Sequence, residues 1–180
     1  MRAIVVLTTG LAVACGALAQ ATVLIPADVG ELSRDAVAIA RGVVVAVDGQ
    51  WTADRRTVET IVALEVEAYL KGQMGDLLRF RVPGGSLGQY RTIVVGAPTF
   101  SIGQRVVVFL GARGPTIPHL LGLGQGVYRL SLGQEGQWLV RPSPVLPSSV
   151  GRVARGSAAR PPVPLGDFER DVRELAGVSR

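Results

Sequence analysis

The sequence predicts a mainly β protein: a small closed barrel of the OB-like or inhibitor-like kind, or a sandwich, with a short N-terminal helix and a C-terminal helix. The 180 residues include 23 Gly and 11 Pro, too many for a helical bundle. Short Val-rich runs alternate with Gly and Pro, as strands alternate with turns. Hydrophobic residues make up 48% and charged residues 18%, which excludes disorder of the whole chain. The length favours one domain.

The first nineteen residues have the pattern of a secretory signal peptide. Arg2 precedes an apolar run too short to span a membrane comfortably, and Ala17-Leu18-Ala19 forms a small-x-small cleavage site before Gln20. We therefore expect an exported protein, periplasmic or secreted, whose mature chain begins at Gln20 and has no transmembrane span.

Cys15 is the one cysteine of the chain and lies inside the expected signal peptide. A mature chain without Cys has no disulfide framework, no Cys-based zinc site and no Cys nucleophile. The residues before Cys15 also resemble, loosely, a lipoprotein signal. A lipid-anchored envelope component is therefore an alternative to a freely exported protein.

The net charge of +5 comes mainly from one segment. Residues 141–164 contain Arg141, Arg152, Arg155 and Arg160 and no acidic residue, while the preceding body is nearly neutral. Nucleic-acid binding requires basic residues clustered on a folded face, because phosphate contacts supply most of the affinity. We therefore expect no nucleic-acid partner.

Four segments are predicted: a signal peptide (1–19), a β-barrel domain (20–140), a linker rich in Pro and Arg (141–164) and an amphipathic helix (165–180). In the body, a helix is expected over Asp28 to Ala36, with Asp28 as its cap. The expected strands are Val37 to Val47, Thr57 to Tyr69, Leu77 to Val82, Thr92 to Val95, Arg105 to Leu110, Gly126 to Leu132 and Trp138 to Val140.

Two strands carry the clearest patterns. The strand from Thr57 to Tyr69 alternates, which is typical of a half-buried antiparallel strand. One face holds Val58, Thr60, Val62, Leu64, Val66 and Ala68, and the other holds Glu59, Glu65 and Glu67 with Ile61 and Ala63 between them. The run from Val106 to Leu110 is continuously apolar, as for a strand buried on both faces. Turns are expected at Asp48-Gly49, Lys71-Gly72, Pro83-Gly84-Gly85 and Gly133.

The C-terminal segment Asp167 to Ala176 regains helical spacing. Phe168, Val172 and Leu175 fall on one face, and Glu169 and Arg173 form an i,i+4 pair on another. This pattern fits two interpretations: a helix that docks on the barrel, or a helix that binds a partner.

The segment from Asp28 to Leu130 resembles a family of uncharacterised exported bacterial proteins. The shared pattern includes "RVPGG", "VVGAPTFSIGQRVVVFL" and "GLGQGVYRL". The residues that carry it are Leu70, Lys71, Gly72, Pro83, Gly84, Gly85, Gly96, Pro98, Phe100, Gly103, Phe109, Leu110, Gly124, Gly126 and Tyr128. The helix-then-barrel layout is more distantly similar to the tissue inhibitors of metalloproteinases, which use an N-terminal Cys and disulfides. This chain has neither, so the resemblance implies the barrel and not the inhibition.

Four features resemble sites, but none predicts a catalytic, cofactor-binding or metal-binding residue. His119 is the one His, and no carboxylate lies within a few positions of it. Glu65 and Glu67 resemble a carboxylate pair, but alternating Glu on a strand is usually its solvated side. Gly122-Leu123-Gly124-Gln125-Gly126 resembles a phosphate loop without its Lys, and turn geometry explains it better. Trp51 either contacts a sugar or partner, or plugs a barrel end.

The sequence therefore predicts an exported, non-enzymatic domain that uses no cofactor and binds a protein or cell-envelope partner. The alternative is a cell-envelope hydrolase whose site assembles residues distant in sequence.

Overall fold

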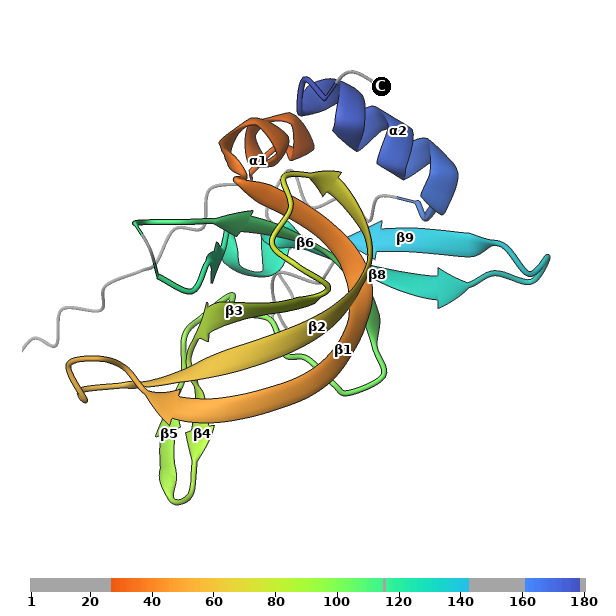
Figure 1. The fold of residues 1–180 in the computed structure, drawn as a ribbon. Coiled ribbons are helices and arrows are strands. Elements are labelled where there is room, and N and C mark those ends of the chain that lie inside the picture. The colour runs from red at the N-terminus through yellow and green to blue at the C-terminus, as the bar shows by residue number, and fades with distance from the viewer. Residues whose placement is uncertain (1–26, 115, 143–160, 179–180) are drawn as a thin grey trace, which may run out of the picture.

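The computed structural model describes residues 27–114, 116–142 and 161–178, and it is mainly β with two helices (Figure 1). The expected signal peptide, its Cys15 and residues 143–160 of the expected linker lie outside these ranges. The elements in chain order are α1 (Val29–Asp35), β1 (Ala38–Trp51), β2 (Val58–Lys71), β3 (Leu77–Pro83), β4 (Gly85–Leu87), β5 (Tyr90–Thr92), β6 (Arg105–Gly111), β7 (His119–Leu120), the 3-10 helix η1 (Leu123–Gly126), β8 (Val127–Leu132), β9 (Trp138–Pro142), β10 (Val163–Pro164) and α2 (Leu165–Leu175).

An eight-stranded sheet forms the framework, in the order β1-β2-β3-β7-β6-β8-β9-β10. Neighbouring strands are antiparallel except β3 and β7, which run parallel and meet at Arg81 and His119. β6 also pairs with β1, from Ala38 opposite Leu110 to Val43 opposite Arg105. The long, curved β1 is therefore bonded on both sides, by β2 and by β6 (Figure 1).

One apolar cluster lies among β1, β2, β3 and β6, and we call it the inner cluster. Leu64 of β2, Phe80 of β3 and Val108 of β6 are fully buried in it. Phe100, from the segment after β5, packs against this cluster with its ring centroid 5.6 Å from that of Phe80. The remaining buried members are Ala40, Val44, Val62, Leu78, Val82, Val106, Leu110, Leu120 and Val127.

A second apolar cluster lies between the sheet and the two helices, and we call it the helix cluster. Tyr128 of β8 stands between Phe109 of β6 and Phe168 of α2, with ring centroids 5.6 and 4.8 Å away. The other buried members of the helix cluster are Leu32, Ala36, Ile39, Leu70, Val107, Val140 and Val172. Val107 and Phe109 belong here, whereas Val106 and Val108 belong to the inner cluster. β6 is therefore buried on both faces, as the sequence predicted.

The C-terminal helix docks on the sheet. Phe168 and Val172 of α2 are buried in the helix cluster, and α2 lies beside α1 (Figure 1). Of the two interpretations left open by the sequence, the docked helix is the one observed. Leu175, expected on the same buried face, is exposed at 42%. Asp28 precedes α1 as expected, but its side chain makes no capping hydrogen bond.

Two strand predictions are wrong in detail. The expected strand Thr92 to Val95 ends at Thr92, and Ile93 and Val95 are exposed. The alternation of β2 breaks at Glu67, where the register with β1 shifts between Arg41 and Gly42. As a result Tyr69, and not the expected Ala68, packs against the inner cluster.

The expected turn at Asp48-Gly49 is also wrong, because both residues lie inside β1. A side chain at Gly49 would overlap the carbonyl oxygen of Ser86 in β4. This glycine is therefore explained by the close approach of a second hairpin and not by a turn. The chain reverses instead between Thr52 and Thr57, where the Thr52 N–H donates to the Thr57 carbonyl at 2.9 Å.

The described parts of the expected linker belong to the sheet. Arg141 and Pro142 continue β9, and Val163 and Pro164 form β10, which pairs with β9. This short strand leads directly into α2 and positions it against the sheet. Among the described residues, no helix is long and apolar enough to cross a membrane.

Candidate functional site

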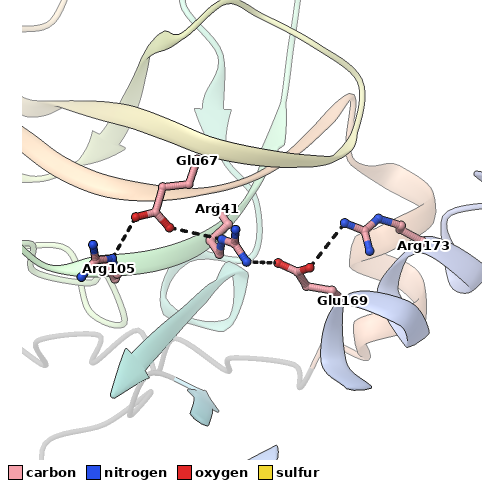
Figure 2. Close-up of polar contacts among 5 residues, drawn as sticks. All are labelled: Arg41, Glu67, Arg105, Glu169 and Arg173. Carbon is pink, nitrogen blue, oxygen red and sulfur yellow. Dashed lines mark hydrogen bonds and ion pairs between the residues drawn. The ribbon is translucent and has the colours of Figure 1, made fainter. Parts of the chain in front are cut away.

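The carboxylate pair considered in the sequence does not form a paired site. Both residues are exposed, and Glu67 contacts two guanidinium groups (Figure 2). Its Oε1 accepts a hydrogen bond from Arg105 Nε at 2.8 Å, and its Oε2 lies 3.3 Å from Arg41 Nε. The second contact is in ion-pair range but is not aligned as a hydrogen bond, so Arg41 Nε has no hydrogen-bond partner.

The same network continues from the sheet to α2 (Figure 2). Arg41 Nη1 lies 2.5 Å from Glu169 Oε1, and Arg173 Nη2 lies 3.4 Å from Glu169 Oε2. The Glu169–Arg173 pair is the one the sequence predicted. Only 13% of the Glu169 side chain and 21% of the Arg41 side chain are exposed. These ion pairs join α2 to β1, so we interpret them as structural. We call this ion-pair network, together with the helix cluster, the clasped side of the molecule.

A groove of about 270 Å³ opens beside the β4–β5 hairpin, and we call it the end groove. Gly84 and Gly85 line one wall, and Ile93, Pro98 and Phe100 line another. Both glycines have positive φ, 83° and 149°, and a side chain at Gly85 would overlap the hydroxyl of Thr60. The positive φ expected at this Pro-Gly-Gly motif is observed, but the predicted turn is only a one-residue break at Gly84, because Pro83 ends β3 and Gly85 begins β4.

Two hydroxyl groups fix this hairpin to the sheet. Thr60 Oγ1 donates to the Gly84 carbonyl at 2.7 Å, and Thr92 Oγ1 accepts from the Val58 N–H at 2.8 Å. With the close approach of Gly49 to Ser86, these contacts hold β4 and β5 against β1 and β2. The end groove therefore has a well-positioned backbone wall.

An exposed aromatic pair stands near this hairpin. Trp51, at the end of β1, meets Tyr90, the first residue of β5, edge to face with ring centroids 5.0 Å apart. Trp51 is 37% exposed and Tyr90 is 52% exposed. Phe100, and not Trp51, packs against the inner cluster, so Trp51 is not the plug of that cluster. We call Trp51, Tyr90 and the exposed Ile93 the aromatic end.

His119 lies in a second cavity, of about 350 Å³, which we call the β3–β7 cavity. Glu59, Arg81 and His119 line it, together with the apolar Pro83, Leu120 and Leu123. Burial, followed by the nearby charges of Arg113 and Arg81, lowers the pKa of His119 below 6.5. The imidazole is therefore neutral at pH 7. A single-residue strand contact between β3 and β7 brings Arg81 and His119 together, and sequence spacing does not reveal it.

The glycine-rich segment near residue 124 is a turn. Gly122 has φ 58°, and residues 123–126 form the 3-10 helix that connects to β8. A side chain at Gly126 would overlap the Leu121 carbonyl oxygen. The turn interpretation of this motif is therefore confirmed. Among the described residues, no three His, Cys, Asp or Glu side chains gather closely enough to hold a metal ion.

No family model matches the sequence, and no match was found among curated proteins or solved structures.

Proposed function

We propose that the protein is an exported, non-enzymatic binding domain built on a small closed barrel of the OB-like kind, and that its aromatic end contacts a protein partner of the cell envelope. The barrel interpretation is supported by the circuit of pairings from β1 through β2, β3, β7 and β6 back to β1. It is also supported by the inner cluster, to which β1, β2, β3, β6 and β7 all contribute.

The observation that carries the binding function is the exposed pair Trp51 and Tyr90 on fixed backbone. Tyr and Trp are enriched at protein interfaces because they bury a large area and lose little conformational freedom on binding. Here the two rings already contact each other and stand near a hairpin held by Thr60 and Thr92. The aromatic end is therefore pre-organised for contact.

The lining of the end groove supports binding in the same way. It combines apolar side chains and glycines with the hydroxyls of Ser86 and Thr99 and the guanidinium of Arg91. Exposed backbone, hydroxyls and one cation suit hydrogen bonds to a partner chain whose apolar side chains enter the groove.

Site-specific photo-crosslinking tests this proposal. A photoreactive phenylalanine at position 90 replaces one ring by another, and the same group at Leu132, which is 61% exposed at the end of β8, serves as the control. In the native host, position 90 should crosslink to one discrete protein and position 132 should not. Equal crosslinking at both positions, or none at position 90, contradicts the proposal.

Export is tested separately by the intact mass of the protein recovered outside the cytoplasm. The pattern Ala17-Leu18-Ala19 predicts a mature chain that begins at Gln20. A chain that begins at Cys15 and carries added acyl mass supports the lipid-anchored alternative instead. A full-length chain found only in the cytoplasm contradicts export.

A further inference from the structure

Arg81 and Arg113 leave their positive charges unpaired beside the β3–β7 cavity. Neither guanidinium forms an ion pair with a described carboxylate, whereas Arg41, Arg105, Arg170 and Arg173 all do. The one side-chain partner of Arg81 is the hydroxyl of Thr116, to which its Nη2 donates at 3.2 Å. A half-buried guanidinium with four further N–H donors is ready to bind an anion.

The charges around this cavity define the anion it suits. β3 contributes Arg81 to the lining, and β7 contributes the neutral His119. Arg113, in the segment before β7, does not line the cavity, but its charge lies near enough to act on His119. β2 contributes one negative charge, Glu59, whose Oε1 accepts a hydrogen bond from Gln50 at 2.9 Å. Arg81 and Glu59 balance each other in the lining, so the nearby Arg113 leaves one positive charge in excess around the cavity. A monoanion fits this balance, whereas a phosphate dianion would be repelled by Glu59.

The rest of the lining is apolar. Pro83, Leu120 and Leu123 offer hydrocarbon surface in the same 350 Å³ cavity. A planar guanidinium matches a carboxylate through two parallel N–H donors, and hydrocarbon next to it favours an aliphatic body on the ligand. The polar and apolar groups therefore point to one ligand class.

We propose that the β3–β7 cavity is a second binding site, independent of the aromatic end, which takes a carboxylate group attached to a short aliphatic body. Arg81 binds the carboxylate, Arg113 adds longer-range attraction, the imidazole of His119 donates an N–H, and Pro83, Leu120 and Leu123 contact the hydrocarbon. A free aliphatic acid and the C-terminal carboxylate of a peptide both present this chemistry.

The imidazole of His119 gives a direct readout, because the chain has one His. NMR titration of the mature protein with butyrate should shift the His119 signals saturably. The bound carboxylate should also raise the pKa of His119, since a nearby negative charge favours the imidazolium. Inorganic phosphate serves as the matched anion and should bind at least tenfold more weakly.

Arg81→Gln should weaken butyrate binding at least tenfold, and Arg113→Gln, in an exposed segment outside the β3 strand, should weaken it by a smaller factor. Arg79→Gln is the matched control, because Arg79 lies on the same strand two positions away and does not line the cavity. It should leave the affinity unchanged. The Arg113 variant keeps the test valid even if Arg81→Gln disturbs folding.

Two further probes distinguish the sources of the carboxylate. Acetyl-leucine binding more tightly than butyrate supports a peptide C-terminus, and the reverse order supports a free aliphatic acid. Acetyl-leucinamide has no carboxylate and should not bind. The proposal is overturned if butyrate gives no saturable shift at about 10 mM, if phosphate binds equally well, or if Arg79→Gln weakens binding as much as Arg81→Gln.

Discussion

The two tryptophans of the chain are almost equally exposed, at 37% for Trp51 and 36% for Trp138, but their surroundings differ. Trp138 lies 4.9 Å from the guanidinium of Arg105, which also binds Glu67 and so belongs to the network that reaches α2 (Figure 2). Trp51 contacts another exposed ring, Tyr90. Exposure alone does not separate a structural tryptophan from a binding one. The contacts of each ring assign Trp138 to the fold and, under the proposed function, Trp51 to binding.

This difference predicts that the clasped side stabilises the fold and the aromatic end serves binding. The largest loss of stability is expected for Phe168→Ala, because Phe168 is 8% exposed and its ring centroid lies 4.8 Å from that of Tyr128. Removing a buried Phe ring costs about 3 kcal/mol. Urea unfolding followed by tryptophan fluorescence measures it. A loss below about 1 kcal/mol would mean that α2 is not part of the cooperative fold.

A smaller loss, about 2 kcal/mol, is expected for Arg41→Gln. This change leaves Glu169 without its sheet partner while 13% of the Glu169 side chain is exposed, so solvent compensates only in part. Arg170→Gln is the matched control on α2, because Arg170 is 62% exposed and pairs only with neighbours on its own helix. It should change the free energy of unfolding by less than about 0.5 kcal/mol. Equal losses of stability in the two variants would contradict a structural role for the ion pairs between β1 and α2.

At the aromatic end, Trp51→Ala combined with Tyr90→Ala should cost less than about 1 kcal/mol of stability, because the two exposed rings mainly contact each other. The same double variant should lose the crosslinked partner. Equilibrium unfolding and partner capture, measured on one preparation, test both expectations. A large loss of stability would place the aromatic pair in the structural part of the molecule.

The smallest expected effect is a pH dependence of the free energy of unfolding that comes from His119 in the β3–β7 cavity. The folded protein lowers the pKa of His119 below 6.5, so the unfolded chain binds more protons as the pH falls. The contribution of the neutral imidazole is complete above about pH 7. It decreases as the pH falls through 6.5 towards the folded pKa. His119→Gln should flatten this part of the stability profile, and an unchanged profile would contradict the assignment.

The sequence predicts the regular parts of the fold well, and the reasons are local. Periodicity locates β2 and α2, and the apolar run of β6 predicts its burial on two faces. The Glu169–Arg173 pair follows from helical spacing alone. Each of these features depends on residues that are close in sequence.

The parts that the sequence does not predict depend on contacts between distant segments. Gly49 resembles a turn residue in the sequence, and only the structure shows that Ser86 packs against it. The two-residue strands β7 and β10 are defined by their pairing with other strands. The candidate sites also depend on contacts between segments that are distant in sequence. Trp51 meets Tyr90 from another hairpin, and Arg81 meets His119 across one strand contact. No local sequence pattern indicates either contact.

One paired measurement separates the aromatic end from the clasped side: capture of the crosslinked partner and free energy of unfolding, both for the Trp51→Ala, Tyr90→Ala double variant and for Arg41→Gln. The two variants should give opposite results. The double variant should lose the partner at least tenfold while remaining stable, and Arg41→Gln should retain the partner while losing about 2 kcal/mol of stability. If capture and stability fall together in either variant, the separation between a binding end and a clasped side is wrong.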